Sequence, residues 1–268
     1  MTMQLWTASL SNRNRKKAMT DLTEKQNKKA IRTVKEIQSR CCPLLIGFGG
    51  SIAYGLDTPK SDIDIRGIFL NPREEWIGLR EETENIRLED SDTVLYGLRK
   101  GMKLLLNGNP NVIEILGLRP EHILYCSEGG RMILDNSSLF LSRKVGFTFG
   151  AFAVNLRRQL QKEVYEGKTD AKKLSKEMAH LIRIYAMGGD LLVNGRVMTY
   201  REYEHDLLTE IRAGKYLDQK RVPTAAYERL LEDYIGSFKS AMMRTHLPAE
   251  PDWERANALT MEIVYSTL

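Results

Sequence analysis

Cysteine is scarce in this chain, and long apolar runs are missing from it. The 268 residues include three cysteines, Cys41, Cys42 and Cys126. An adjacent pair and a distant third residue have neither the spacing of zinc ligands nor that of a disulfide framework. No apolar run approaches the ~20 residues that a membrane helix needs, and the start lacks the charged, apolar and small-residue regions of a signal peptide. We therefore expect no membrane partner and a reducing, cytoplasmic setting.

Internal repeats and low-complexity segments are also absent, and the composition is typical of a soluble globular protein. Apolar residues make up 42% of the chain and charged residues 28%. A chain of this length can hold one large or two small domains. The net charge of +5 is uneven, because ten lysines and arginines but three acids precede residue 41. We expect residues 1–22 to form a basic, flexible extension, which either contacts phosphate backbones or is simply solvated.

A glycine-rich turn and a pair of aspartates are the most informative features. Gly50 and Ser51 follow the apolar run 44–48, and after a spacer of ten residues Asp62 and Asp64 open a second apolar run. Residues i and i+2 of a strand point to the same face, so the two carboxylates project together. They repel each other unless a cation lies between them, and such hard oxygen ligands suit Mg²⁺ bound with substrate phosphates. A glycine turn beside them lets backbone N–H groups approach an anion closely.

These residues resemble a known catalytic signature. The pattern Phe48-Gly49-Gly50-Ser51, a ten-residue spacer and Asp62-Ile63-Asp64-Ile65 is similar to that of the DNA polymerase beta superfamily of nucleotidyltransferases. The resemblance implies that the Gly-Ser turn holds a nucleoside triphosphate (NTP) and that the aspartates hold two metal ions, Mg²⁺ or Mn²⁺. It also implies a third carboxylate on a neighbouring strand. Glu89, Asp90 and Asp92 are the candidates, and we favour Asp92 because it directly precedes the β-prone run 93–96.

Blocks further along the chain resemble one branch of this superfamily more closely. They are Tyr96–Lys100, Leu104–Leu106, Gly108–Leu116, Leu139–Lys144 and the stretch from His180 to Gly188. The branch comprises the predicted RNA-repair nucleotidyltransferases of bacteria and large phages, and the resemblance covers roughly residues 44–215. It implies that the acceptor is an RNA end. Gly101 departs from the branch, which tends to carry a large apolar residue there.

The resemblance also implies a set of nucleotide-binding residues, which are Gly49, Gly50, Ser51, Tyr54, Ser61, Lys100, His180 and Arg183. His180 and Arg183 share one face of a predicted helix, and the resemblance turns that face toward the active site. Ordinary alternatives are a buried histidine with satisfied hydrogen bonds, and pairing of Arg183 with Glu177 or Asp190. Arg99 and Lys100 open a helix just after the third acid, where one of them could neutralise triphosphate charge or both could simply be solvated. Glu114 could hydrogen-bond either to backbone or to substrate.

The hydrophobic pattern predicts an α+β fold. It indicates a helix over 23–40, strands at 44–48, 62–70, 86–96 and 123–125, shorter helices over 98–106 and 112–118, and long helices over 140–165, 171–192 and 227–243. We expect a small mixed β-sheet nucleotidyltransferase core with flanking helices over residues 23–135, followed by an all-α region over residues 136–268. Cations on the long helices are candidates for shaping a base pocket or an acceptor groove: Arg157, Arg158, Lys162, Lys172, Lys173, Lys176 and Arg183.

The leading hypothesis is a metal-dependent nucleotidyltransferase that moves a nucleoside monophosphate from an NTP to an acceptor hydroxyl on an RNA end. In it, Asp62, Asp64 and Asp92 are both catalytic and metal-binding. A second hypothesis is nucleotidylylation of a protein in a toxin–antitoxin or phage–host setting. A third is a nucleotide- or RNA-binding module without catalysis, against which the intact Asp62 and Asp64 argue, because buried like charges without a metal are costly. The sequence leaves the preferred nucleotide and the oligomeric state open.

Overall fold

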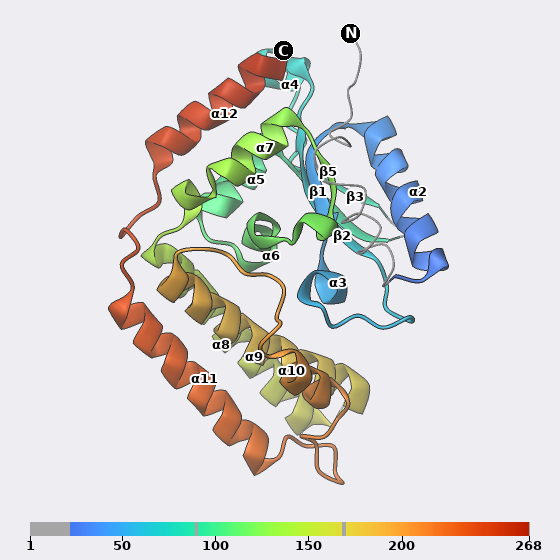
Figure 1. Cartoon of the computed structure of the whole chain (residues 1–268), viewed down its shortest axis with the longest axis vertical. Coiled ribbons are helices and arrows are strands. Elements are labelled where there is room, and N and C mark those ends of the chain that lie inside the picture. The colour runs from blue at the N-terminus through green and yellow to red at the C-terminus, as the bar shows by residue number, and fades with distance from the viewer. Residues whose placement is uncertain (1–21, 89–90, 168–169, 268) are drawn as a thin grey trace.

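The structure is a computed structural model that describes residues 22–88, 91–167 and 170–267. Of the basic extension expected over residues 1–22, Leu22 alone falls within this part, and the acid candidates Glu89 and Asp90 lie outside it. The described fold is α+β, as predicted. A mixed sheet with flanking helices is followed by a helical region (Figure 1).

One mixed sheet of five strands is present in the described part of the chain. The strands are β1 (Cys42–Phe48), β2 (Asp64–Leu70), β3 (Asn85–Leu88), β4 (Asp92–Gly97) and β5 (Ile123–Cys126). Their order across the sheet is β3-β4-β2-β1-β5. The central pair β2 and β4 is parallel, and every other neighbouring pair is antiparallel. The parallel pair therefore brings the starts of two strands to the same end of the sheet.

The single strand predicted over residues 86–96 is wrong, because this stretch forms the two strands β3 and β4. They pair antiparallel, with Ile86 opposite Leu95 and Leu88 opposite Thr93. The chain direction therefore reverses from β3 to β4, which the sequence analysis placed inside one strand. The reversal makes β3 an edge strand and leaves β4 free to pair with β2.

Helices cover both faces of the sheet. Helix α2 (Glu24–Arg40) begins at Thr23, whose side chain caps it, and packs Ala30 and Ile37 against Ile46 and Ile65. On the opposite face, α5 (Leu98–Leu106) contacts β2, and α7 (Glu128–Asp135) contacts β1. The short helices α3 (Gly50–Tyr54), α4 (Arg73–Ile77) and α6 (Pro110–Ile113), and the 3₁₀ turns η2 (Glu114–Gly117), η3 (Pro120–His122) and η4 (Ser137–Phe140), connect these elements. The strand alternation thus places one set of apolar residues under α2 and the other under α5 and α7.

The second half of the chain is helical, as predicted. It comprises α8 (Arg143–Glu166), α9 (Ala171–Asn194), α10 (His205–Arg212), α11 (Ala225–Arg244) and α12 (Trp253–Thr267). Helix α9 contacts α8, α10 and α11, and residues 181–188 are buried without interruption, as expected for a helix enclosed on all sides. The sequence pattern did not indicate α7, α10 or α12. No helix in the described residues combines the length and apolarity that a bilayer crossing requires.

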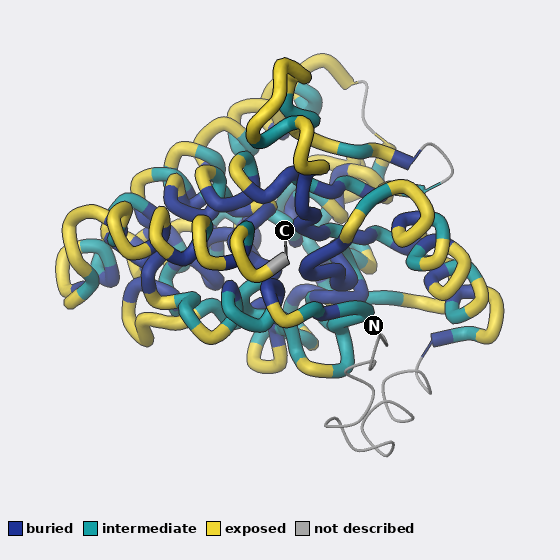
Figure 2. Tube along the Cα trace, turned by 90° about the horizontal axis from the view of Figure 1, so that it is seen from above, coloured by how far each residue is buried: buried dark blue, intermediate teal, exposed yellow. Residues whose placement is uncertain are grey.

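One hydrophobic core joins the two halves. Its buried residues run from Leu44 and Ile68 of the sheet through Phe149 and Met187 to Ile263 of α12, and α12 returns to pack on α7 and α5. Figure 2 shows the buried segments running through the middle of the molecule between exposed outer faces. The domain boundary between residues 135 and 136 stays a prediction. We call residues 22–135 the sheet half and residues 136–267 the helical half, and one core spans both.

Candidate active site

The aspartates lie where the parallel strands begin. Asp62 lies two residues before the start of β2 and is exposed, whereas Ile63 and Ile65 are buried under α2. Asp64, the first residue of β2, stands opposite Asp92, the first residue of β4. Because pairing in register places both residues on the same face of the sheet, the structure brings the predicted metal-binding carboxylates together. Asp92, the third carboxylate that we favoured, lies at this position, whereas Glu89 and Asp90 fall outside the described residues.

Asp64 experiences the charge of its neighbours. Burial raises the pKa of its carboxyl, the negative charges of Asp92 and Asp62 raise it further, and the positive charges of Arg66 and Lys176 oppose them. The cluster therefore attracts cations. As the side chains stand, however, no group of three His, Cys, Asp or Glu residues among the described residues is arranged to hold a metal ion. The Asp92 carboxylate is directed at Arg66 instead, at 3.2 Å from Asp92 Oδ2 to Arg66 Nη2.

Arg66 is a member of this site that the sequence analysis missed. It lies on β2, two residues after Asp64 and on the same face. Besides the carboxylate of Asp92, its Nη1 donates to the backbone carbonyls of Ile65, at 3.0 Å, and of Asp92. The side chain is 20% exposed. The motif Asp-x-Asp-x-Arg carried the signal, because period-two alternation puts all three charged residues on one face.

The glycine-rich turn closes directly over Asp64. The Gly49 N–H donates to the Asp64 carbonyl at 2.8 Å. Gly50, with φ of 56°, begins α3, and a Cβ placed there would lie 1.7 Å from Asp64 Oδ2. The left-handed backbone and the absent side chain are therefore both required for the carboxylate to occupy its place. Ser51 follows in α3 and is partly exposed.

Tyr54 and Arg183 meet at a buried glutamate between the two halves. The Tyr54 hydroxyl donates to Glu114 Oε2 at 2.7 Å. Arg183 Nη1 lies 3.7 Å from the same oxygen, and the guanidinium lies 3.6 Å from the centre of the Tyr54 ring. Burial raises the pKa of Glu114, while Arg183 and the Tyr54 hydrogen bond lower it. Arg183 thus pairs with Glu114 rather than with Glu177 or Asp190, and Glu114 binds side chains of the protein.

His180 lies beside this cluster on α9, with its ring 5.9 Å from that of Phe152. Burial and the positive charges of Arg183 and Lys176 lower the pKa of His180 to about 3. The imidazole is therefore neutral at physiological pH. Its Nε2, like Arg183 Nε, is buried without a hydrogen-bond partner within the described part of the chain. A polar atom left in this state is where water or a ligand group is expected.

Two of the predicted nucleotide-binding residues have other neighbours. The Ser61 hydroxyl accepts from the Thr58 N–H at 2.9 Å, inside the loop that leads to β2. Lys100 lies on α5, beyond the end of β4, and pairs with Glu84 at 3.2 Å. Since Asp92 begins β4, Lys100 is at the opposite end of that strand. The structure therefore does not bring Lys100 to the aspartates, although the two are close in sequence.

Residues 195–204 connect α9 to α10 and hydrogen-bond to residues of the site. We call this segment the strap. Thr199 Oγ1 donates to the Glu114 carbonyl at 2.6 Å, and the Arg201 N–H donates to the Tyr54 carbonyl at 3.1 Å. The strap thus holds both the end of α3 and the start of η2. No local sequence pattern indicated it.

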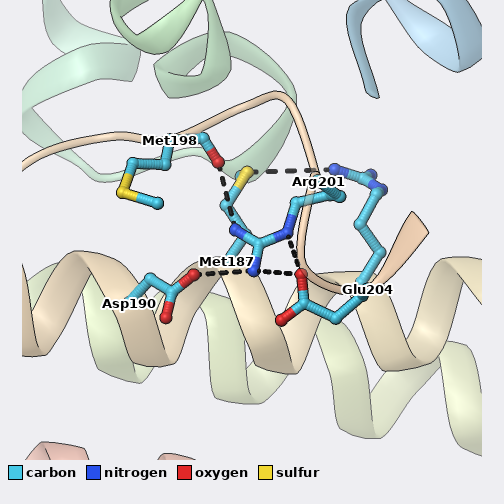
Figure 3. A network of polar contacts seen from close by, with 6 residues as sticks. Met187, Asp190, Met198, Arg201 and Glu204 are labelled. Atoms are coloured by element: carbon cyan, nitrogen blue, oxygen red, sulfur yellow. Dashed lines mark hydrogen bonds and ion pairs between the residues drawn. The ribbon is translucent and has the colours of Figure 1, made fainter. Parts of the chain in front are cut away.

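The side chain of Arg201 anchors the strap to α9 (Figure 3). It is 1% exposed, and its Nη2 lies 2.6 Å from Asp190 and 2.7 Å from Glu204. Its Nη1 donates to the Met198 carbonyl at 3.2 Å. All the charges in this network have close partners, which is the arrangement that makes a buried ion pair tolerable.

A small mixed sheet, a Gly-Gly-Ser turn closed over one aspartate, and a second aspartate beside it on a parallel strand define a nucleotidyltransferase of the DNA polymerase beta type. The sequence model of the RNA repair pathway DNA polymerase beta family (RlaP) matches residues 22–262 of this chain. The chain therefore belongs to that family.

A viral protein shows a more local similarity. An uncharacterised 38.9 kDa protein of Enterobacteria phage T4, from the nrdC–mobD intergenic region, is 32% identical over 103 residues. The similarity covers 34% of this chain and 31% of the phage protein, so the chain spans about a third of the length of this curated relative.

Proposed function

We propose that the protein transfers a nucleoside monophosphate from an NTP to a hydroxyl at an RNA end, with the help of divalent metal ions. The observation that carries the proposal is the pairing of Asp64 and Asp92 on adjacent parallel strands beneath the Gly49–Gly50 turn. The family description adds RNA repair as the setting.

The chemistry of the donor set fits Mg²⁺ or Mn²⁺. Asp62, Asp64 and Asp92 offer carboxylate oxygens, the ligands that hard divalent cations prefer. Arg66 shows that a cation already occupies part of this space. Asp62, Asp64 and Asp92 would hold the metal ions, with the Asp92 side chain turned from Arg66. When bound, the ions would neutralise triphosphate charge and lower the pKa of the acceptor hydroxyl.

The protein's own groups would orient the two substrates. Backbone N–H groups at Gly50 and Ser51 and the exposed Lys176 would bind the triphosphate. Arg183 Nε and His180 Nε2, which are buried without a hydrogen-bond partner within the described part of the chain, would be directed toward the bound nucleotide. The acceptor oxygen attacks the α-phosphorus, the bond from this phosphorus to the bridging oxygen breaks, and pyrophosphate leaves. The hydroxyl proton passes to Asp92, whose side chain is 62% exposed.

Labelled transfer tests this function. The full chain is incubated with each α-labelled NTP, Mg²⁺ or Mn²⁺, and total RNA or total protein, and the products are separated on gels. We expect label in RNA with the wild type and none with Asp64→Asn, while the control Asp206→Asn, which changes a fully exposed aspartate of α10, transfers normally. Label in protein would favour the nucleotidylylation hypothesis, and label in neither would favour a binding module.

A further inference from the structure

Arg66 occupies the space between the glycine turn and Asp92. Its Nη2 lies 3.2 Å from Asp92 Oδ2. At its other end, a Cβ placed on Gly49 would lie 3.1 Å from Arg66 Cγ and 3.9 Å from Arg66 Nε. One side chain therefore lines both the turn expected to receive the triphosphate and the carboxylate expected to receive a metal ion.

The contacts of Arg66 are of two kinds. The two backbone carbonyls, of Ile65 and Asp92, accept from Nη1, and the carboxylate of Asp92 accepts from Nη2. The side chain of Asp92 is 62% exposed, so its carboxylate has room to rotate. A divalent ion on that carboxylate would repel the guanidinium and compete for its oxygen.

A guanidinium that loses a carboxylate finds an equivalent partner in phosphate. Its planar fork matches both groups, and each pairing consists of charge-assisted hydrogen bonds. The triphosphate and the metal ion are expected at the two ends of the same side chain. Arrival of the phosphate would therefore draw Arg66 from Asp92 and free that carboxylate for the metal.

We propose that Arg66 exchanges partners, bound to Asp92 in the empty site and to a phosphate oxygen of the nucleotide in the loaded one. This inference rests on the proposed function, since it takes an NTP and a divalent ion as the ligands. It assigns Arg66 two roles, as the resident cation that balances the aspartates without a metal and as a phosphate ligand during binding. Metal loading at Asp92 is then favoured by the presence of nucleotide.

Separate binding measurements test the exchange without relying on activity. Mn²⁺ binding to the full chain is followed by electron paramagnetic resonance without nucleotide, and binding of a non-hydrolysable NTP analogue by calorimetry in EDTA. Arg66→Gln should bind Mn²⁺ about fivefold more tightly, because a competitor is gone, and the analogue about fivefold more weakly, because a phosphate ligand is gone. Arg66→Lys, which keeps the charge without the fork, should fall between.

Two control variants distinguish the effect of direct contact between Arg66 and Asp92 from the effect of any positive charge near the site. Lys176→Gln removes a positive charge that acts on Asp64 from α9, and its effect on Mn²⁺ affinity should be smaller than that of Arg66→Gln. Arg99→Gln removes an arginine paired with Glu82 beyond the far end of β4, and should change neither affinity. Circular dichroism and thermal melts establish that each variant is folded.

The binding results distinguish failure of the exchange from failure of the proposed function. Weaker Mn²⁺ binding by Arg66→Gln would overturn the exchange and make Arg66 a brace that holds Asp92 in place. Unchanged affinity for both ligands would overturn it as well. If neither the wild type nor Arg66→Gln binds Mn²⁺ or the analogue, the proposed function itself fails, and the inference fails with it.

Discussion

The arginine–carboxylate cluster around Arg201 in the helical half and the one around Arg66 in the sheet half differ in how closely their carboxylates are paired. Arg201 in the helical half is fully enclosed and has two carboxylates within 2.7 Å. Arg66 in the sheet half has one carboxylate at 3.2 Å, while Asp64 beside it has a pKa raised by burial and by its acidic neighbours. Both carboxylates of the first cluster lie within 2.7 Å of the guanidinium, whereas in the second the Asp64 carboxylate is subject to the negative charges of Asp92 and Asp62.

We infer from this difference that the Arg201 cluster stabilises the fold, whereas the cluster around Arg66 and Asp64 binds a ligand. A buried ion network with all its partners present fixes the arrangement of the chain around it. Carboxylates that lie close together without a cation between them repel each other and destabilise the site until a ligand of the opposite sign arrives. We therefore expect substitutions in the Arg201 network to act mainly on stability, and substitutions around Asp64 to act mainly on ligand binding.

Arg201→Met should give the largest loss of stability. It leaves Asp190 and Glu204 without their partner, and breaking a buried pair in this way costs about 3 kcal/mol or more. Urea unfolding followed by circular dichroism measures the change. Arg99→Met, at an arginine whose side chain is 44% exposed, is the control and should cost less than about 1 kcal/mol. Equal losses in the two variants would remove the distinction between the clusters.

Gly50→Ala should abolish nucleotide and metal binding and also lower stability. The new methyl group would collide with Asp64 Oδ2. Gly195→Ala is a matched control, because Gly195 has φ of 61° and a Cβ placed there would lie 3.8 Å from Leu247 Cδ2, an ordinary contact distance. The control should cost about 1 kcal/mol through its backbone alone, and Gly50→Ala about 2 kcal/mol more. Similar unfolding midpoints and normal binding in both would move the Asp64 carboxylate away from the turn.

Asp64→Asn should change the pH dependence of stability. The folded protein holds the Asp64 proton more tightly than the unfolded chain, because its folded pKa lies above the ordinary value near 3.8. Its contribution to metal-free stability is therefore full below that value and is lost as pH rises from there through the folded pKa. Unfolding curves across this range should show a shallower decline for Asp64→Asn. Added Mn²⁺ should stabilise the wild type at neutral pH and leave the variant unchanged.

Lys176→Gln should have the smallest effect. The side chain is exposed, so stability should stay within about 0.5 kcal/mol of the wild type. Its charge acts on the space around Asp64, so affinity for an NTP analogue should fall and depend less on salt. Lys100→Gln, at the far end of β4, should leave that affinity unchanged. A larger loss from Lys100→Gln would show that sequence proximity to Asp92 was the better guide.

The sequence predicted what depends on local pattern. Alternation placed Asp62 and Asp64 on one face and Ile63 and Ile65 on the other, and helical periodicity gave α2, α8, α9 and α11 nearly to their ends. The glycine turn was found because its spacing from the aspartates resembles a known signature. Each of these features is determined by residues that are close together in the sequence.

What the sequence did not predict depends on pairing between distant residues. The contact of Arg66 with Asp92 follows from the register of two parallel strands, and the reversal between β3 and β4 creates that pairing. Arg183 pairs with Glu114, and Arg201 with Asp190, only because α9 and the strap pack against the sheet half. Lys100 was assigned to the nucleotide because it is near Asp92 in sequence, although a whole strand separates them.

The position of α12 has a consequence for how the protein is made. Ile263 and Leu44 both lie close to Gly129 of α7, so the helix that covers the first strand is itself covered by a helix synthesised long after it. At ~5–20 residues per second, a ribosome would take on the order of tens of seconds to reach Ile263 after completing β1. Until α12 is made, the faces of α5 and α7 that it covers would present an apolar surface that chaperones or other chains can bind. A ribosome stalled before Trp253 would leave that surface uncovered.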